Sequence, residues 1–141
     1  MTARSILVGL ACSLLLLAPV PPASAAKVAA SLTVPAGKTK RIQLRNLAQG
    51  TLVDVAVKSD GDIAVIFIGA AELKANPHHA QPLFAGRMER RLSFSLKIAS
   101  AGNYYVFLDN SKGKESRTIT VAIQTTRAEP KDLPNSKSRS F

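Results

Sequence analysis

Two adjacent histidines, His78 and His79, are the residues best suited to hold a metal ion, and the chain has no other histidine. Imidazole nitrogens bind zinc and copper, but such sites usually bring three or four ligands to one point. Only Glu72 and Glu89 lie near the pair in sequence, and the single cysteine, Cys12, is far from it. The histidines are therefore a weak candidate metal site, and their surroundings favour a solvated loop. We expect no metal and no other cofactor.

The sequence lacks the common motifs of nucleophilic catalysis and phosphate binding. It contains no Gly-x-Ser-x-Gly and no Gly-rich phosphate loop. Asp60 and Asp62 are close enough in sequence to act as an acid–base pair, but they flank Gly61 in a run typical of a hairpin turn. Aspartate is favoured in such turns because it hydrogen-bonds to nearby backbone. We therefore expect that the protein is not an enzyme.

Positive charge is the most marked feature of the chain, with 19 lysines and arginines against 9 aspartates and glutamates and a formal net charge of +10. Two groups of arginines stand out, Arg41 with Arg45 and, further along, Arg87 with Arg90 and Arg91. Arg41 and Arg45 are an even number of residues apart, so a strand would place them on one face. Arginine forks hold carboxylates or phosphates through paired hydrogen bonds. These five arginines are the candidate site for an acidic protein or an anionic envelope component; the alternative is that they provide solubility and protect strand edges.

The first 25 residues have the organisation of a signal peptide. Arg4 precedes an apolar run over residues 6–18, prolines follow, and the Ala-Ser-Ala run at 23–25 has the small-x-small pattern of a cleavage site. The apolar run has about 13 residues, whereas a membrane-spanning helix needs roughly 20. We therefore predict cleavage after Ala25 and a periplasmic or secreted mature chain with no transmembrane segment. Export, together with the lack of interleaved basic and aromatic residues, argues against nucleic acid as a partner.

The elements that must position these residues are β-strands. Seven runs alternate with period two or are short and apolar, and turn residues separate them; they cover residues 28–34, 41–45, 53–57, 63–68, 92–98, 104–109 and 117–126. No run has the helical period that parallel βαβ units need. The pattern predicts an all-β fold, an antiparallel β-sandwich of about seven strands with jelly-roll or Greek-key character, over residues 26–126.

Two segments fall outside this rhythm. Residues 70–91 contain one possible helical turn at 70–75, which Asn76-Pro77 should end, and we expect the rest to be an irregular loop. Loops of this length are often functional, so this segment is a candidate site for a small solute or a metal. Residues 127–141 contain two prolines and no periodicity, which predicts a disordered tail.

The C-terminal third carries a more specific pattern. An alternating run over residues 92–98 leads to Ala-Gly-Asn-Tyr at 101–104 and to a strand that ends in Asp-Asn at 109–110. This order resembles the last strands of GOLD-like domains, and the pre-peptidase C-terminal domains share a similar Gly-x-Tyr ending. The resemblance covers about residues 51–126 and implies a β-sandwich that acts as a non-catalytic interaction module. At such a corner we expect the Tyr104 ring in the core and its hydroxyl bonded to backbone.

These observations favour an exported, non-catalytic β-sandwich that binds a protein or an anionic envelope partner. Two other functions stay open. One is a small periplasmic solute- or metal-binding protein that uses residues 70–91. The other, which the pre-peptidase resemblance implies, is an accessory factor to an exported hydrolase. Eukaryotic GOLD proteins of the secretory pathway carry a disulfide, a coiled coil and a membrane anchor; this chain lacks them, so a cargo-receptor role is not expected.

Overall fold

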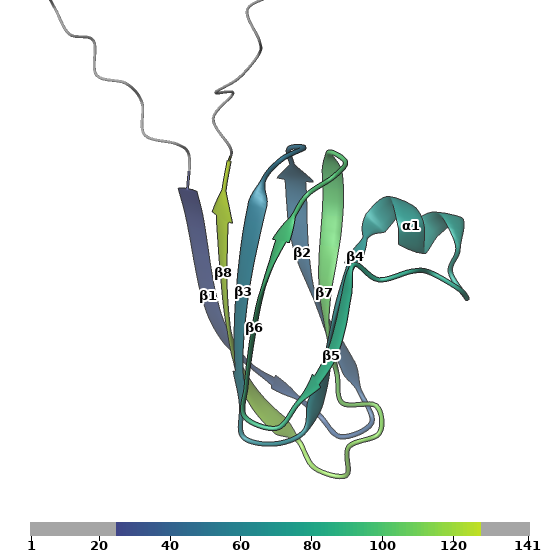
Figure 1. Ribbon diagram of the computed structural model, residues 1–141. Coiled ribbons are helices and arrows are strands. Elements are labelled where there is room, and N and C mark those ends of the chain that lie inside the picture. The colour runs from purple at the N-terminus through teal and green to yellow at the C-terminus, as the bar shows by residue number, and fades with distance from the viewer. Residues whose placement is uncertain (1–24, 128–141) are drawn as a thin grey trace, which may run out of the picture.

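The computed structural model describes residues 25–127, which form eight strands and one short helix (Figure 1). The elements are β1 (Ala25–Val34), β2 (Thr39–Leu47), β3 (Leu52–Ser59), β4 (Ile63–Gly69), α1 (Ala70–Ala75), β5 (Phe84–Met88), β6 (Arg91–Lys97), β7 (Gly102–Asp109) and β8 (Arg117–Thr126). The strands form two four-stranded antiparallel sheets, with the orders β1-β8-β3-β6 and β2-β7-β4-β5. Two such sheets with this strand order are the arrangement of a jelly roll. The prediction of an antiparallel β-sandwich is confirmed, with eight strands where about seven were expected.

The additional strand, β5, lies inside the segment that was expected to be irregular. It pairs with β4 from Ile63 opposite Met88 to Phe67 opposite Phe84. Sequence periodicity missed it because it has only five residues and contains Gly86. That glycine has a packing role: a Cβ atom at Gly86 would lie 2.8 Å from the ring of Phe84, which stacks on Phe94 at a centroid distance of 3.9 Å. The segment 70–91 is therefore a short helix, a loop and a strand, and the expectation of one long irregular loop after residue 75 is wrong.

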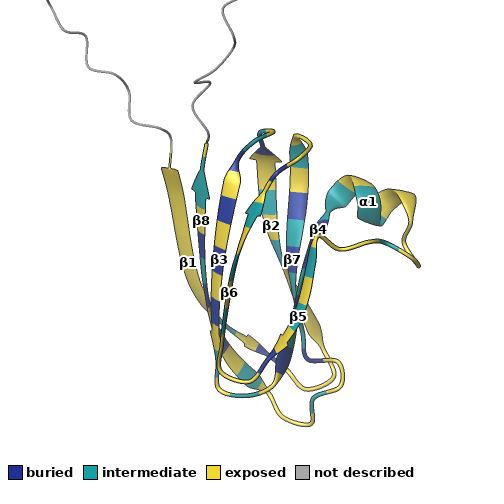
Figure 2. Cartoon of the chain, in the orientation of Figure 1, coloured by how far each residue is buried: buried dark blue, intermediate teal, exposed yellow. Residues whose placement is uncertain are grey.

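The core lies between the two sheets and is built from alternate residues of the central strands (Figure 2). Side chains on a strand alternate between its two faces, and on the central strands the predicted inward sets are buried. On β3 and β8 these are Val53, Val55, Val57, Ile119, Val121 and Ile123, all at most 3% exposed. The inward residues of β6 are only half-buried because β6 lies at an edge of its sheet.

Tyr104 occupies the corner expected of it. Its ring is 7% exposed and stacks on the buried Phe67 ring at a centroid distance of 5.6 Å. Its hydroxyl donates a hydrogen bond of 2.6 Å to the backbone carbonyl of Ser100. The ring therefore contributes apolar burial while the hydroxyl ties the turn before β7 to the core.

We expect Tyr104→Phe to lower the free energy of unfolding by about 0.5–1.5 kcal/mol, because the substitution removes one hydrogen bond and retains the ring. Urea unfolding of the two proteins measures the difference. Tyr105→Phe, on the opposite face of the same strand, is the control and should change stability by less. Equal effects of the two substitutions would mean that the bond to Ser100 contributes nothing to stability.

The predicted signal peptide and tail lie outside the described residues, apart from Ala25, which begins β1, and Arg127, which follows β8. Within residues 25–127, no helix has the length and apolar character needed to cross a membrane.

Candidate functional site

Three of the five candidate arginines lie on the outer face of the sheet β2-β7-β4-β5. One row of paired residues crosses all four strands: Arg41 lies opposite Phe107, Phe107 opposite Ile66, and Ile66 opposite Ala85. In the next row, Tyr105 lies opposite Ile68. We call this surface the arginine-flanked face; its members are Arg41 and Arg45 on β2, Tyr105 and Phe107 on β7, Ile66 on β4, and Ala85 and Arg87 on β5, whereas Ile68, opposite Tyr105, is buried.

Arg41 is held in place by an aromatic ring. Its guanidinium lies 4.9 Å from the ring centroid of Tyr105, a cation–π contact, and the Tyr105 and Phe107 rings are 6.0 Å apart. Tyr104 points into the core, so the alternation of the strand directs Tyr105 outward. A stacked guanidinium keeps its N–H edges available, so Arg41 is preorganised to bind a carboxylate.

Two acidic residues, Asp62 and Asp109, line a depression together with Arg87. One carboxylate oxygen of Asp109 accepts hydrogen bonds from the Thr39 hydroxyl at 3.0 Å and from the Ser111 amide at 2.8 Å. Partial burial raises the pKa of Asp109, but the bonds from Ser111 and Thr39 outweigh that effect and hold its pKa below the usual value. Among residues 25–127, the ion pair present joins Arg117 to Glu115 at 3.4 Å, and none involves the five candidate arginines. Arg87 therefore lies near two carboxylates without forming an ion pair with either, and Arg45 donates a hydrogen bond of 3.3 Å to the Gln43 side chain.

The structure separates the second arginine group. Arg87 belongs to the arginine-flanked face, whereas Arg91 begins β6 in the other sheet and lies opposite Lys58. Arg90 lies in the turn between them, where its carbonyl accepts a hydrogen bond of 2.9 Å from the Ser59 amide. Residues that are close in sequence here point to different surfaces because the chain crosses from one sheet to the other between β5 and β6.

His78 and His79 are exposed in the turn after α1, where the His79 amide donates to the Asn76 carbonyl at 3.1 Å. The Glu72 carboxylate accepts from the Asn76 side chain at 3.2 Å and from the Gln81 amide at 3.1 Å. It therefore organises the loop. Within the described part of the chain, no three side chains of the metal-ligating types come together.

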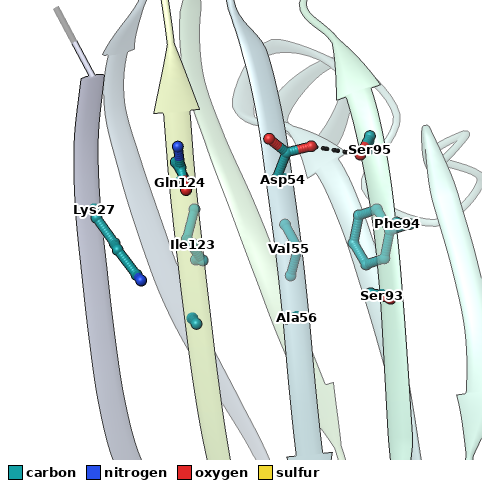
Figure 3. Close-up of a pocket in the computed structure, with 10 residues that line it drawn as sticks. Lys27, Asp54, Val55, Ala56, Ser93, Phe94, Ser95, Ile123 and Gln124 are labelled. Atoms are coloured by element: carbon teal, nitrogen blue, oxygen red, sulfur yellow. Dashed lines mark hydrogen bonds between the residues drawn. The ribbon is translucent and has the colours of Figure 1, made fainter.

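A second feature, which the sequence did not reveal, is a depression of about 330 Å³ on the outer face of the other sheet (Figure 3). Its floor consists of Ala56 and Ala122, which lie opposite each other on β3 and β8. Polar side chains surround the floor: Lys27, Asp54, Ser93, Ser95 and Gln124. The Ser95 hydroxyl donates to the Asp54 carboxylate. The small outward-facing alanines at 56 and 122 are visible in the sequence, but only the pairing of β3 with β8 places them side by side to form the floor of the depression.

Fold and site define the protein as an antiparallel β-sandwich of jelly-roll topology with a basic, partly apolar outer face. No family model matches the sequence, and no curated protein matches it significantly. Solved structures do share the fold. One is PliG of Aeromonas hydrophila, a periplasmic inhibitor of g-type lysozyme: identity is 13%, coverage is 77% of this chain and 92% of that chain, and the TM-score is 0.54. Another is from Bacillus endospore appendages, a family of disulfide-linked pili, at 14% identity, 74% and 88% coverage and a TM-score of 0.50.

Proposed function

We propose that this protein is an exported, non-catalytic binding domain that recognises an acidic protein partner through the arginine-flanked face. The observation that carries the proposal is the placement of Arg41 and Arg87 on the two opposite edge strands, on either side of an apolar centre formed by Tyr105, Phe107 and Ile66. Interfaces commonly combine buried aromatic residues with a charged rim, and arginine, tyrosine and phenylalanine are enriched in them.

The apolar centre favours a protein over an anionic envelope polymer. A polyanion uses the cations alone, whereas a protein surface with apolar side chains and carboxylates uses the cations and the rings together. The signal-like residues 1–25 support export. The lack of assembled catalytic motifs in the sequence supports a binding role, as does the resemblance of residues 51–126 to GOLD-like and pre-peptidase domains, which stays a prediction.

The test compares two triple substitutions that remove the same charge. R41A/R45A/R87A removes the cations of the proposed face, and K58A/R91A/K97A removes three exposed cations from the opposite sheet. At about 50 mM salt, we expect the first variant to bind polyglutamate about tenfold more weakly than the parent and the second to bind within about twofold, since three exposed ion pairs contribute roughly 0.2–1 kcal/mol each.

Salt titration and a second surface complete this test. Exposed charges are screened over about 10 Å at 0.1 M salt, so the difference between the variants should shrink as salt rises. Vesicles that contain phosphatidylglycerol serve as an anionic surface without a polypeptide. Equal weakening of the two variants on polyglutamate would refute a defined acidic-protein site. Selective loss on vesicles, with no selective loss on polyglutamate, would identify the envelope component as the partner instead.

A further inference from the structure

The four edge strands of the two sheets differ in how well they are protected against pairing with another strand. Three carry known protective features. On β2 the register shifts between Leu44 and Leu47, and the strand carries several cations. β5 is only five residues long. β6 begins with Arg91 and ends with Lys97.

The fourth edge strand, β1, has neither a register shift nor a short length, and it carries fewer cations than β2 or β6. It runs for ten residues without a register shift, from Ala25 opposite Thr126 to Val34 opposite Arg117. Its only charged residue is Lys27. Within residues 25–127, one edge of β1 pairs with β8 and the other pairs with no strand. This leaves a long row of backbone N–H and C=O groups that can form a ladder with another chain.

The inward face of β1 is also uncovered along most of the strand. Residues 25–31 are exposed on both faces of the strand (Figure 2). Val28, which points to the interior side, is 57% exposed. Its partner Ile123 on the neighbouring strand β8 is only 3% exposed. The side chains on the inward face therefore go from buried to exposed between β8 and β1. In Figure 1 the N-terminal half of β1 lies at the outer side of its sheet and apart from β2.

The opening contains cations. A depression of about 210 Å³ lies between the start of β1 and the end of β2. Ala26 and Thr125 line it from one sheet, and Arg45, Leu47 and Thr51 line it from the other side, with Arg127 also present. Asn46 has a φ of 52° within the register shift of β2, which alters the regular alternation beside Arg45. A strand added to β1 would therefore end beside two arginines.

We propose that the free edge of β1 accepts an extended segment of an acidic protein as an added antiparallel strand. This inference rests on the proposed function for the charge of the partner and adds the mode of docking. β1 begins at the end where Arg45 and Arg127 lie, so an antiparallel strand reaches them with its C-terminal residues. Apolar side chains of that strand cover Val28, and carboxylates at its end meet the two arginines.

Charge selects an acidic partner over a second copy of this chain. Pairing β1 with β1 of another copy would bring together two chains that each carry an excess of positive charge and that each have Arg45 and Arg127 beside the start of β1. Like charges facing each other across an interface oppose association. An acidic strand places opposite charge there.

A synthetic peptide tests the docking mode directly. The probe is Thr-Val-Thr-Val-Thr-Val-Glu-Glu with a free C-terminus. Two further peptides have the same sequence with backbone N-methyl groups, one at the odd-numbered residues and the other at the even-numbered residues; we call these the two methylation frames. Only one frame directs its N–H groups toward β1, so we expect one methylated peptide to bind at least about tenfold more weakly and the other to bind like the probe, since the lost ladder contains several hydrogen bonds. Equal affinities of the three peptides would overturn strand addition.

A matched pair of substitutions in the full chain places the site. Val28→Lys puts a charge on the inward side of the edge, which blocks strand pairing although it adds attraction for the acidic peptide. Leu52→Lys changes another exposed apolar residue, on β3, at 45% exposure. We expect at least a tenfold loss for the first and none for the second, with both melting temperatures near that of the parent. Equal binding by the two variants would refute the location at β1.

The two proposals can fail separately. Peptide binding that depends on Arg41, Arg45 and Arg87 but not on the methylation frame supports the acidic-partner function and refutes strand addition. A peptide that ends in Thr-Thr instead of Glu-Glu tests the opposite case, in which strand addition occurs without an acidic partner. If it binds as well as the probe, with the same frame dependence, while R41A/R45A/R87A leaves polyglutamate binding unchanged, β1 accepts strands and the acidic-partner proposal is wrong.

Discussion

Replacing Phe67 with alanine is expected to lower the free energy of unfolding by about 3–5 kcal/mol, the range for a large aromatic side chain removed from a well-packed core. Phe67 is 0% exposed and lies in β4 at the centre of the sandwich. It stacks on Tyr104 at 5.6 Å and meets Phe94 edge-on at 6.3 Å, so its removal leaves a cavity that touches both sheets. The rigid strands around it cannot close that space.

Urea unfolding measures this loss, with both proteins fitted to the same dependence of the unfolding free energy on urea concentration. Phe107→Ala is the matched control. Phe107 lies on β7 and is half-buried on the outer face, so its truncation leaves no enclosed cavity. We expect its cost to be less than half that of Phe67→Ala. If the two losses were equal, Phe67 would not be the centre of the core.

The second large effect is expected at Asn110, the buried amide after β7. It is 2% exposed, and its side-chain nitrogen donates to three backbone carbonyls: Val34 at 3.1 Å, Pro35 at 3.2 Å and Glu115 at 2.8 Å. These bonds join the turn between β1 and β2 to the turn between β7 and β8, and each of these turns crosses from one sheet to the other. Its amide oxygen is buried without a hydrogen-bond partner and lies against Gly113, where a side chain would not fit. A substitution that removes the Asn110 nitrogen takes the donor away from the three backbone carbonyls, and a buried acceptor without a donor lowers stability by roughly 1–3 kcal/mol.

We expect Asn110→Asp to lower the free energy of unfolding by about 2–4 kcal/mol, because an acceptor then faces three carbonyl oxygens. The loss should be greater at about pH 8 than at about pH 4. Burial raises the pKa of the introduced carboxyl above its unfolded value, so stability falls as pH rises through that pKa. Asn103→Ala is the control: Asn103 is exposed and accepts one bond of 2.9 Å from the Asn46 amide. A pH-independent loss equal to that of the control would show that the three bonds do not hold the turns together.

The alternation of apolar residues was sufficient to predict the sandwich and much of its core. The inward sets of β3 and β8 are buried as predicted, and Tyr104 bonds to backbone as its corner position implied. Period two reports which face of a strand is apolar, and that information is local. Where the local signal was weak, as over the five residues of β5 with Gly86, the sequence did not reveal the strand.

Arginine content and spacing identified candidate binding residues but not the surfaces to which they belong. Arg87 and Arg91 are neighbours in sequence and lie on different sheets, whereas Arg41 and Arg87 are distant in sequence and share one face. The proximity of Arg41 to Tyr105 depends on the pairing of β2 with β7. Such pairing is long-range, because each strand offers the same backbone groups to every possible neighbour and the packing of the whole core decides between them.

The sequence by itself determined the all-β class, the inward faces of the long strands, the corner role of Tyr104 and the excess of positive charge. Only the tertiary structure decided that, among residues 25–127, β1 pairs with β8 along one edge and with no strand along the other, and that Val28 is exposed near the depression that Arg45 lines. The physical reason is that side-chain direction follows from the backbone period of one strand. Strand neighbours, open edges and clustered charges instead depend on the free energy of burying many distant residues together.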